Sequence, residues 1–310
     1  DQLKTHLHKD YFTLNLLIQS EGRYSFQDDN FQGGKSFSVP NARISIKGSL
    51  DGGFFYRVFV DAAPKPVLLD AYAGYKVSDA FSFTLGAQKP NQTLDYIPDP
   101  GSHNFVDRTT MTSLLVGSRE LGFSATGDIG DFYYYAGFFN GNRLESNSNN
   151  LFYGIGRLQY TIKDILPGYI QFAASGSHGN SEGTISGSSG PLLRGKRTIL
   201  GSDIELSLNR LYFAAEYLQG DLETVDLPNE NELISGYYFT SGLRLTEKTM
   251  SFARWQTWSF READTTENKF TLGTNINFTN IVGLVLNLDA YMPNQGDTKY
   301  GASFIFQVQF

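Results

Sequence analysis

The sequence predicts an all-β protein, a single transmembrane antiparallel β-barrel of about sixteen strands. Its composition, with 25 Phe, 18 Tyr and 32 Gly but only 3 Met among 310 residues, favours strands and turns over helices. Short segments in which apolar and polar residues alternate recur from residue 11 to the last residue. No apolar run approaches the roughly 18 to 20 residues that a membrane-spanning helix needs, so a membrane would have to be crossed by strands.

The last segment, residues 299–310, has the clearest two-faced pattern. Apolar residues occupy alternate positions, small or polar residues occupy the positions between them, and Ile305 is the one exception. The apolar set is Tyr300, Ala302, Phe304, Phe306, Val308 and Phe310, and the other set is Gly301, Ser303, Gln307 and Gln309. Such a strand, ending on an aromatic residue, resembles the closing strand of a bacterial outer-membrane barrel. We therefore expect Phe310 at the periplasmic rim, and Phe304 and Phe306 facing lipid or a neighbouring protomer.

The same alternation marks five strands before residue 89. They are expected at about 11–25, 42–47, 54–61, 68–77 and 81–88. Asp51-Gly52-Gly53, between the second and the third, is a strong hairpin signal. The alternation then stops from Lys89 to Glu120, the longest connection in the chain. Connections of this length are usually functional or disordered.

From residue 121 the alternation continues to the end of the chain. Eleven more strands are expected at about 121–128, 132–140, 151–162, 169–178, 197–207, 210–219, 233–244, 248–258, 269–278, 284–292 and 299–310. An even number of strands places both chain termini on one side of the membrane, as in single-chain bacterial barrels. Short connections alternate with long polar ones, and the long ones include 26–40, 89–120, 179–195 and 220–232. This asymmetry is typical of short periplasmic turns and long outer loops.

Two regions follow from this pattern. Residues 1–10 are expected to be a polar periplasmic tail, and residues 11–310 a single outer-membrane barrel. No signal peptide precedes Asp1, which we expect to begin a processed chain. The net charge of -7 argues against a nucleic-acid partner, and the absence of cysteine excludes disulfides and zinc-thiolate sites. No cofactor and no metal are predicted.

Seven stretches in the first half of the chain carry a more specific signal. They are NARISIKG (41–48), FYRVFVD (55–61), DAYAGY (70–75), LGAQKP (85–90), FVDR (105–108), GSRELG (117–122) and FFNG (138–141). In this order and at this spacing they resemble the phosphate-selective porins O and P. Beyond residue 141 the resemblance is only to barrel strands in general.

This resemblance implies a homotrimeric channel of sixteen strands in the bacterial outer membrane, through which small hydrophilic solutes or anions diffuse passively. It also implies that the third loop, here 89–120, folds into the lumen and forms the constriction. The implied selectivity residues are Lys89, Asp107, Arg108 and Arg119 in that loop, and Arg43, Lys47, Arg57 and Lys76 on inward strand faces. By alternation, acidic residues also face inward, namely Glu21, Asp61, Asp70, Asp203, Glu205, Glu216 and Asp289. Because the two signs nearly balance, the sequence leaves the ion selectivity open.

Several of these residues also have a structural interpretation. Arg57 and Asp61 share one strand face, as do Asp70 and Lys76, so each pair could hold the polar interior together. The aromatic residues Tyr133, Tyr134, Tyr135, Trp255 and Trp258 are expected at the membrane interface or facing lipid rather than as platforms for sugars.

Two further questions concern function class and assembly. His103, beside Ser102 and near Asp99, is the best catalytic candidate, but adjacent residues seldom converge on one site and no enzyme is predicted. The alternative to a channel is a barrel that anchors or binds a partner. Small residues on the outward face of the N-terminal strands, Ala42, Ala71, Ala73 and Ala87, favour close contact between protomers there, together with the last strand.

Overall fold

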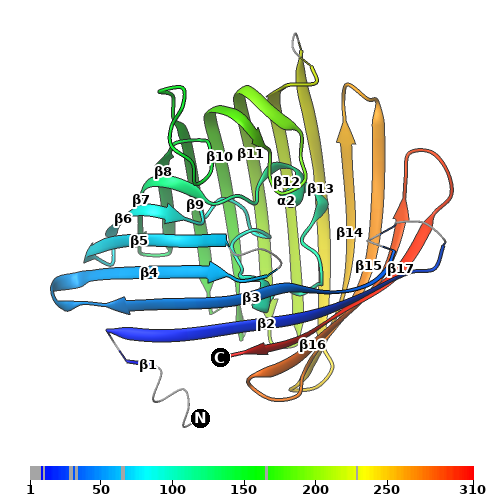
Figure 1. Ribbon diagram of the computed structural model, residues 1–310. Coiled ribbons are helices and arrows are strands. Elements are labelled where there is room, and N and C mark those ends of the chain that lie inside the picture. The colour runs from blue at the N-terminus through cyan, green and yellow to red at the C-terminus, as the bar shows by residue number, and fades with distance from the viewer. Residues whose placement is uncertain are drawn as a thin grey trace.

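The computed structural model describes residues 8, 9, 11–27, 31, 34–63, 67–164, 167–227 and 230–310, which form a closed antiparallel barrel of sixteen strands (Figure 1). The strands are β2 (Phe12–Ser25), β3 (Lys35–Ser49), β4 (Phe54–Asp61), β5 (Val67–Ser78), β6 (Phe81–Gln88), β7 (Glu120–Ile129), β8 (Phe132–Phe139), β9 (Tyr153–Lys163), β10 (Gly168–Ile185), β11 (Leu192–Leu208), β12 (Leu211–Thr224), β13 (Asn231–Arg244), β14 (Thr249–Phe260), β15 (Thr265–Asn277), β16 (Val282–Met292) and β17 (Lys299–Gln309). Each pairs with its neighbours in the chain, and β17 closes the ring on β2. The predicted strand number and topology are confirmed.

The first residues of the chain are described only in part. A two-residue strand, β1 (His8–Lys9), pairs with the start of β2. Most of the predicted periplasmic tail, residues 1–7 and 10, lies outside the described residues.

Closure gives the wall two faces, which differ in the side chains they carry. Apolar residues on one face are exposed, with Leu288 at 56% and Phe306 at 43% of their full accessibility. Polar residues on the other face are buried, with Thr271 at 0% and Asp289 at 3%. We call these the outer and the inner face. The exposure of Phe304 and Phe306 agrees with the prediction.

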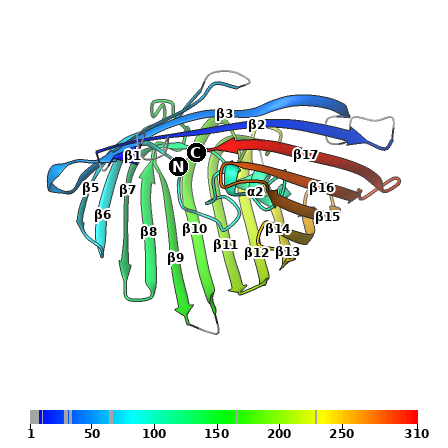
Figure 2. The same ribbon diagram turned by 90° about the horizontal axis from the view of Figure 1, so that it is seen from below.

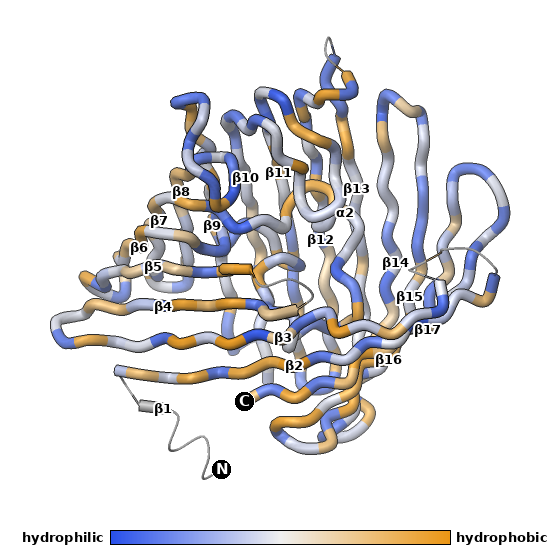
Figure 3. The backbone as a smooth tube through the Cα atoms, in the orientation of Figure 1, coloured by the Kyte–Doolittle hydropathy of each residue, from blue (hydrophilic) through white to orange (hydrophobic). Residues whose placement is uncertain are grey.

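The two ends of the barrel also differ. At one end, where the Leu16 N–H donates to the carbonyl of Phe310 at 2.8 Å, the connections are short, such as 79–80 and 130–131. We call this the periplasmic end. At the opposite, outer end, hydrophilic residues gather in hairpins such as β14–β15 (Figure 3).

Two predicted outer loops are partly strand, which corrects the expected boundaries. β3 begins at Lys35, inside the predicted connection 26–40, and only residues 186–191 join β10 to β11 where 179–195 was predicted. In β3 the alternation is present, since Phe37 and Val39 are exposed and Ser36 and Ser38 lie between them. The outer ends of β10 and β11 carry polar residues on both faces, so the alternation that marks a membrane-facing strand is absent from them. Backbone pairing with the neighbouring strand continues nevertheless, for example between Glu182 and Arg194.

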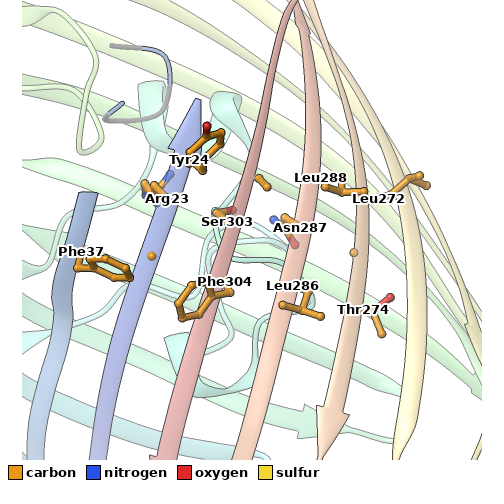
Figure 4. Close-up of a pocket in the computed structure, with 13 residues that line it drawn as sticks. Arg23, Tyr24, Phe37, Leu272, Thr274, Leu286, Asn287, Leu288, Ser303 and Phe304 are labelled. Carbon is orange, nitrogen blue, oxygen red and sulfur yellow. The ribbon is translucent and has the colours of Figure 1, made fainter. Parts of the chain in front are cut away.

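The outer face is hollowed over β2 and β15 to β17 (Figure 4). The hollow has a volume of about 660 Å³ and apolar walls that include Leu272, Leu286 and Phe304. Gly22 lies beneath the ring of Phe304, since a Cβ atom on Gly22 would come within 2.4 Å of that ring. The glycine therefore allows the aromatic side chain to lie against β2.

Among the described residues, helix is confined to short pieces in connections. The α-helix α2 (Thr110–Leu115) has six residues, and no described helix has the length and apolar character needed to span a bilayer.

Because the outer face contacts lipid, we expect a charged residue there to lower the free energy of unfolding by an amount that depends on its depth in the bilayer. Leu286→Arg, in the middle of β16, should lower the free energy of unfolding by about 2 to 4 kcal/mol, because an arginine there faces the hydrocarbon core. Ile129→Arg, at the periplasmic end of β7, is the control and should cost about 0 to 1 kcal/mol. Chemical denaturation of the liposome-inserted variants measures both. Equal costs would contradict the assigned membrane position of β16.

Candidate functional site

The long segment between β6 and β7, residues 89–119, contacts the inner face of the barrel wall. Gln92 Nε2 donates to Ser177 Oγ of β10 at 2.9 Å. The carboxylate of Glu216, on β12, accepts the backbone N–H of Leu94 at 2.8 Å. Figures 1 and 2 show α2, which belongs to this segment, within the ring of strands.

The same segment also reaches the strands that close the barrel. Its 3-10 turn, η3 (Pro100–Ser102), accepts hydrogen bonds from Gln19 of β2 to the Pro100 carbonyl and from Gln307 of β17 to the Gly101 carbonyl, at 3.3 and 3.1 Å. Val106 packs with Val285 and Ile305 on the inner face. Ile305, the exception in the last strand's alternation, is thus an apolar contact for the segment.

An apolar cluster fixes α2 against the wall. Thr109 caps the helix by accepting the Thr112 N–H at 3.3 Å, and Gln256 accepts the Thr110 N–H at 2.9 Å. The cluster combines Tyr96, Met111, Leu114, Leu115 and Val116 of the segment with Leu193, Ile199, Leu218, Leu222, Ile234 and Trp258 of the wall. A six-residue helix has little stability alone, so this packing holds it.

Three arginines surround one aromatic ring beside the segment. The guanidinium carbons of Arg57, Arg43 and Arg119 lie 4.3, 5.6 and 5.7 Å from the centre of the Phe59 ring, which is 5% exposed. The face of an aromatic ring attracts cations, so the Phe59 ring packs favourably among three arginines whose positive charges repel one another. We call Arg43, Arg57, Arg119 and Phe59 the arginine cluster.

Carboxylates from the wall hold these arginines in place. Arg43 Nε lies 2.7 Å from Asp61 Oδ2. Asp70 is shared, since its carboxylate lies 2.9 Å from Arg119 Nε and 3.2 Å from Arg57 Nη1. The predicted pairs Arg57–Asp61 and Asp70–Lys76 are therefore wrong. Ion pairs form between neighbouring strands and with the segment, and spacing along one strand does not reveal those partners.

The segment adds Lys89 and Arg108 to this group. Lys89 Nζ donates to the carbonyls of Ile97 and Pro98, both at 2.9 Å, and lies 3.5 Å from Asp99 Oδ1. Arg108 donates to the carbonyls of Asp95 and Pro98. Both cations therefore hold the segment's own backbone as well as contributing charge.

The charges of this region do not cancel. Asp99 also lies 3.6 Å from Arg57, which links the segment to β4. The cations are Arg43, Lys47, Arg57, Lys89, Arg108 and Arg119, and the carboxylates are Asp61, Asp70, Asp95 and Asp99. Among these ten residues, with Lys89 protonated, six positive charges against four negative ones leave an excess of two.

One of these cations titrates near neutral pH. Burial, and then the charge of Arg108, lowers the pKa of Lys89 to about 7. Burial, and then Arg108, also lowers the pKa of His103 to about 3, so this imidazole is neutral at physiological pH. Its Nε2 lies 3.2 Å from the Pro98 carbonyl.

The other predicted site residues lie in different places. Lys47 is exposed and stands opposite Arg57 at the periplasmic edge of the arginine cluster. Lys76 is wrong as a constriction residue, because its exposed side chain pairs with Asp79 in the periplasmic turn at 2.6 Å. Asp107 makes two contacts with Arg23, at 2.6 and 3.0 Å, on the β2 side of the segment.

The sequence analysis missed Arg23. It lies two residues after Glu21, which alternation already placed inward, so the same alternation could have identified it.

Three predicted interface aromatics face inward instead. Tyr135 and Trp258 are buried, at 4% and 5% exposure, and the Tyr133 hydroxyl accepts from Asn91 Nδ2 at 2.8 Å. Trp258 packs against α2 in the apolar cluster. Tyr134 and Trp255 keep the predicted outward direction, since Tyr134 alternates with its inward neighbours and Trp255 is 39% exposed. Consecutive residues of a strand point to opposite faces, so Tyr133, Tyr134 and Tyr135 cannot form one outer girdle.

Two buried ion pairs lie outside the arginine cluster. Arg157 makes two contacts with Asp203, at 2.6 and 2.9 Å, with side chains 0% and 1% exposed. Arg197 lies 2.9 Å from Glu120, also buried. These charges are neutralised in place, so we assign them to the wall and not to the permeation path. Within the described residues, no group of His, Asp or Glu is arranged to hold a metal ion.

Comparisons with known proteins place this geometry in context. Residues 12–189 match the family model described as phosphate-selective porin O and P. No curated protein sequence is significantly similar to the chain.

Solved structures share the fold at low identity. An anion-selective porin from Comamonas acidovorans is 12% identical, with a TM-score of 0.72 over 96% of this chain and 99% of that chain. In-vitro folded OmpT of Vibrio cholerae in a trimer form is 12% identical, with a TM-score of 0.72 over 97% of this chain and 100% of that chain. Salmonella typhi OmpF in complex with daunomycin is 10% identical, with a TM-score of 0.70 over 96% and 97%.

The buried pair Arg157–Asp203 yields a stability prediction. Arg157→Met should lower the free energy of unfolding by about 3 to 5 kcal/mol, because it leaves the buried Asp203 carboxylate without its partner. The double variant Arg157→Met/Asp203→Leu is the matched control and should recover most of that loss. Denaturant titration in detergent measures both variants. A single variant as stable as the double one would show that the pair is not structural.

Proposed function

This chain belongs to the phosphate-selective porin O and P family, and from that premise we propose that its pore favours anions. It is a channel of the bacterial outer membrane through which small hydrophilic solutes diffuse. In this proposal the segment 89–119 lies in the lumen as the constriction, and the solute passes the arginine cluster beside it. The contacts of the segment with both β10–β12 and β17–β2 support this position.

The observation that carries the proposal is the excess of positive charge at the segment. Three guanidiniums converge on Phe59, and Lys89 and Arg108 approach from the segment. A narrow, low-dielectric path focuses the field of such charges and raises the local concentration of anions. Asp107 lies outside this group and pairs with Arg23, so its role is to hold the segment.

We assign a general preference for small anions, phosphate included, rather than a tight phosphate site. Arg43, Arg57 and Arg119 each already hold a carboxylate within 3.2 Å. A permeating anion therefore competes with fixed carboxylates for the same donors. Weak, replaceable contacts of this kind allow a solute to leave as easily as it enters.

Transport, and not catalysis, is the proposed activity. His103 is buried against the Pro98 carbonyl and is held neutral by its environment. A base of very low pKa cannot activate a nucleophile efficiently near neutral pH.

Ion selectivity as a function of pH tests the proposal. In planar bilayers under a salt gradient, the reversal potential should favour anions. This preference should weaken as pH rises from 6 to 8, because Lys89 is charged below its pKa of about 7 and neutral above it, which lowers the excess from two to one. Lys89→Met should abolish the pH step. Lys163→Met should leave it unchanged, because this exposed lysine lies at the periplasmic end of β9 and pairs with Asp131.

The possible results separate the alternatives. Cation preference at pH 6 would contradict the proposed selectivity. A preference for anions without any pH step would remove Lys89 from the constriction while leaving the arginine cluster. A complete lack of conductance would favour the structural-anchor alternative.

The proposed assembly is a homotrimer in contact through the N-terminal strands and β17. On the outer face, the exposed Ala73 and the partly exposed Ala71 lie among larger apolar residues, with Val58 at 45% and Leu85 at 63% exposure. A surface on which small residues lie next to large ones allows two protomers to pack closely in a bilayer. Ala87, which alternation placed on this surface, is 5% exposed and contributes little to it.

Cross-linking tests the trimer. The natural chain has no cysteine, so Ala73→Cys provides a single reactive site. With a bifunctional thiol reagent this variant should give covalent oligomers. Leu286→Cys, on the outer face of β16, should give no covalent oligomers. A monodisperse monomer in mild detergent with no cross-link from either site would refute the assembly.

A further inference from the structure

The tip of the β10–β11 hairpin, residues 186–191, folds back onto α2. The backbone N–H groups of Ser188 and Ser189 both donate to the Ser113 carbonyl of α2, at 2.8 and 3.0 Å. The Ser186 hydroxyl donates to the Leu115 carbonyl at 3.4 Å. The last carbonyls of a helix have no hydrogen-bond donors within the helix, and here the hairpin tip supplies the donors.

The tip approaches α2 closely because of two glycines. Gly187 has a φ of +53°, and a Cβ atom there would come within 2.2 Å of the Ser113 carbonyl oxygen. A Cβ atom on Gly190 would come within 2.1 Å of the Leu114 carbonyl oxygen. The tip is itself closed by hydrogen bonds from the Ser186 N–H to Pro191 and from the Gly190 N–H to Ser186, at 2.8 and 2.9 Å.

Arg143, from the connection between β8 and β9, secures the tip from the other side. Its Nη2 donates to the carbonyls of Ile185 and Gly187, at 2.9 and 2.6 Å. Its backbone N–H donates to the Glu120 carboxylate at 3.1 Å, and Glu120 also lies 2.9 Å from Arg197 of β11. The hairpin tip, α2 and the start of β7 are therefore joined in one hydrogen-bonded unit.

We propose that Ser186–Pro191, secured by Arg143, positions α2 and thereby sets the width of the pore. This inference rests on the proposed role of the segment 89–119 as the constriction. The apolar cluster holds the wall-facing side of α2, and the hairpin tip holds its C-terminal end. With one of the two supports removed, the helix keeps its place in the lumen but gains freedom to move at that end.

Two variants on the same hairpin test the positioning role. Gly187→Val should displace the tip, whereas Gly183→Val is the matched control, because Gly183 also has a positive φ, +67°, but a Cβ atom there meets nothing within 4 Å. Arg143→Met removes the support without adding bulk. Gly187→Val and Arg143→Met should shift single-channel conductance, increase open-channel noise and admit larger neutral polymers, while Gly183→Val should match the parent chain. Parent-like conductance and polymer cut-off in both folded variants would overturn the proposal.

A cross-link measures the contact independently of transport. In this cysteine-free chain, Ser113→Cys combined with Ser188→Cys should be joined by oxidation or by a short thiol reagent, which would lower open-channel noise. Ser113→Cys alone is the control. Failure of the pair to cross-link in the folded protein would overturn the anchor. If the parent chain did not conduct, the proposed function would fail, and cross-linking would still decide whether the tip holds α2.

Discussion

Closure of the sheet between β17 and β2 is the constraint on which the rest of this structure depends. In a bilayer, backbone N–H and C=O groups find no water, so every strand needs a partner on both sides. The register from Gly301 opposite Ser25 to Gln309 opposite Leu17 supplies the last pairing. Once the ring is closed, alternate side chains face two different environments. The exposed Phe306 and the buried Ser303 of β17 show the result.

The inner face is divided between two tasks, and the division positions the site. Across β11 to β14 it carries apolar residues such as Leu218 and Ile234, which pack against α2. Across β3 to β5 it carries Arg43, Arg57 and Phe59 of the arginine cluster with their carboxylates, and Arg119 joins them from the segment. The segment is held by apolar contact on the first side, so its backbone and Lys89 meet the charged wall on the second. The asymmetry of the wall thus decides on which side of the barrel the segment meets charged residues.

The fold was predictable because period-two alternation is strong wherever a strand faces hydrocarbon. It fails where one face has no lipid, as in the outer parts of β10 and β11, which the sequence predicted as loop. Two apolar residues depart from the predicted outward direction. Ile305 and Trp258 lie on the inner face, because the inner face packs against the segment at these positions.

The site was predictable only in part. Arg43, Arg57 and Arg119 follow from parity and family resemblance, but their convergence on Phe59 depends on cross-strand register and on the path of a connection without periodicity.

The carboxylates in the cluster explain how so much positive charge is tolerated in one place. Arginines this close repel one another, and in a narrow lumen that repulsion is poorly screened. Asp70, shared by Arg57 and Arg119, offsets it and holds both side chains in fixed positions. In the proposed anion pathway each such carboxylate also lowers the net attraction for an anion, so the carboxylates that make the wall rigid reduce its preference for anions. The remaining excess is small enough that a single proton on Lys89 changes it by half. In the proposed anion-selective pore, selectivity therefore depends on fine adjustment of a nearly balanced set of charges, and not on a uniformly basic channel.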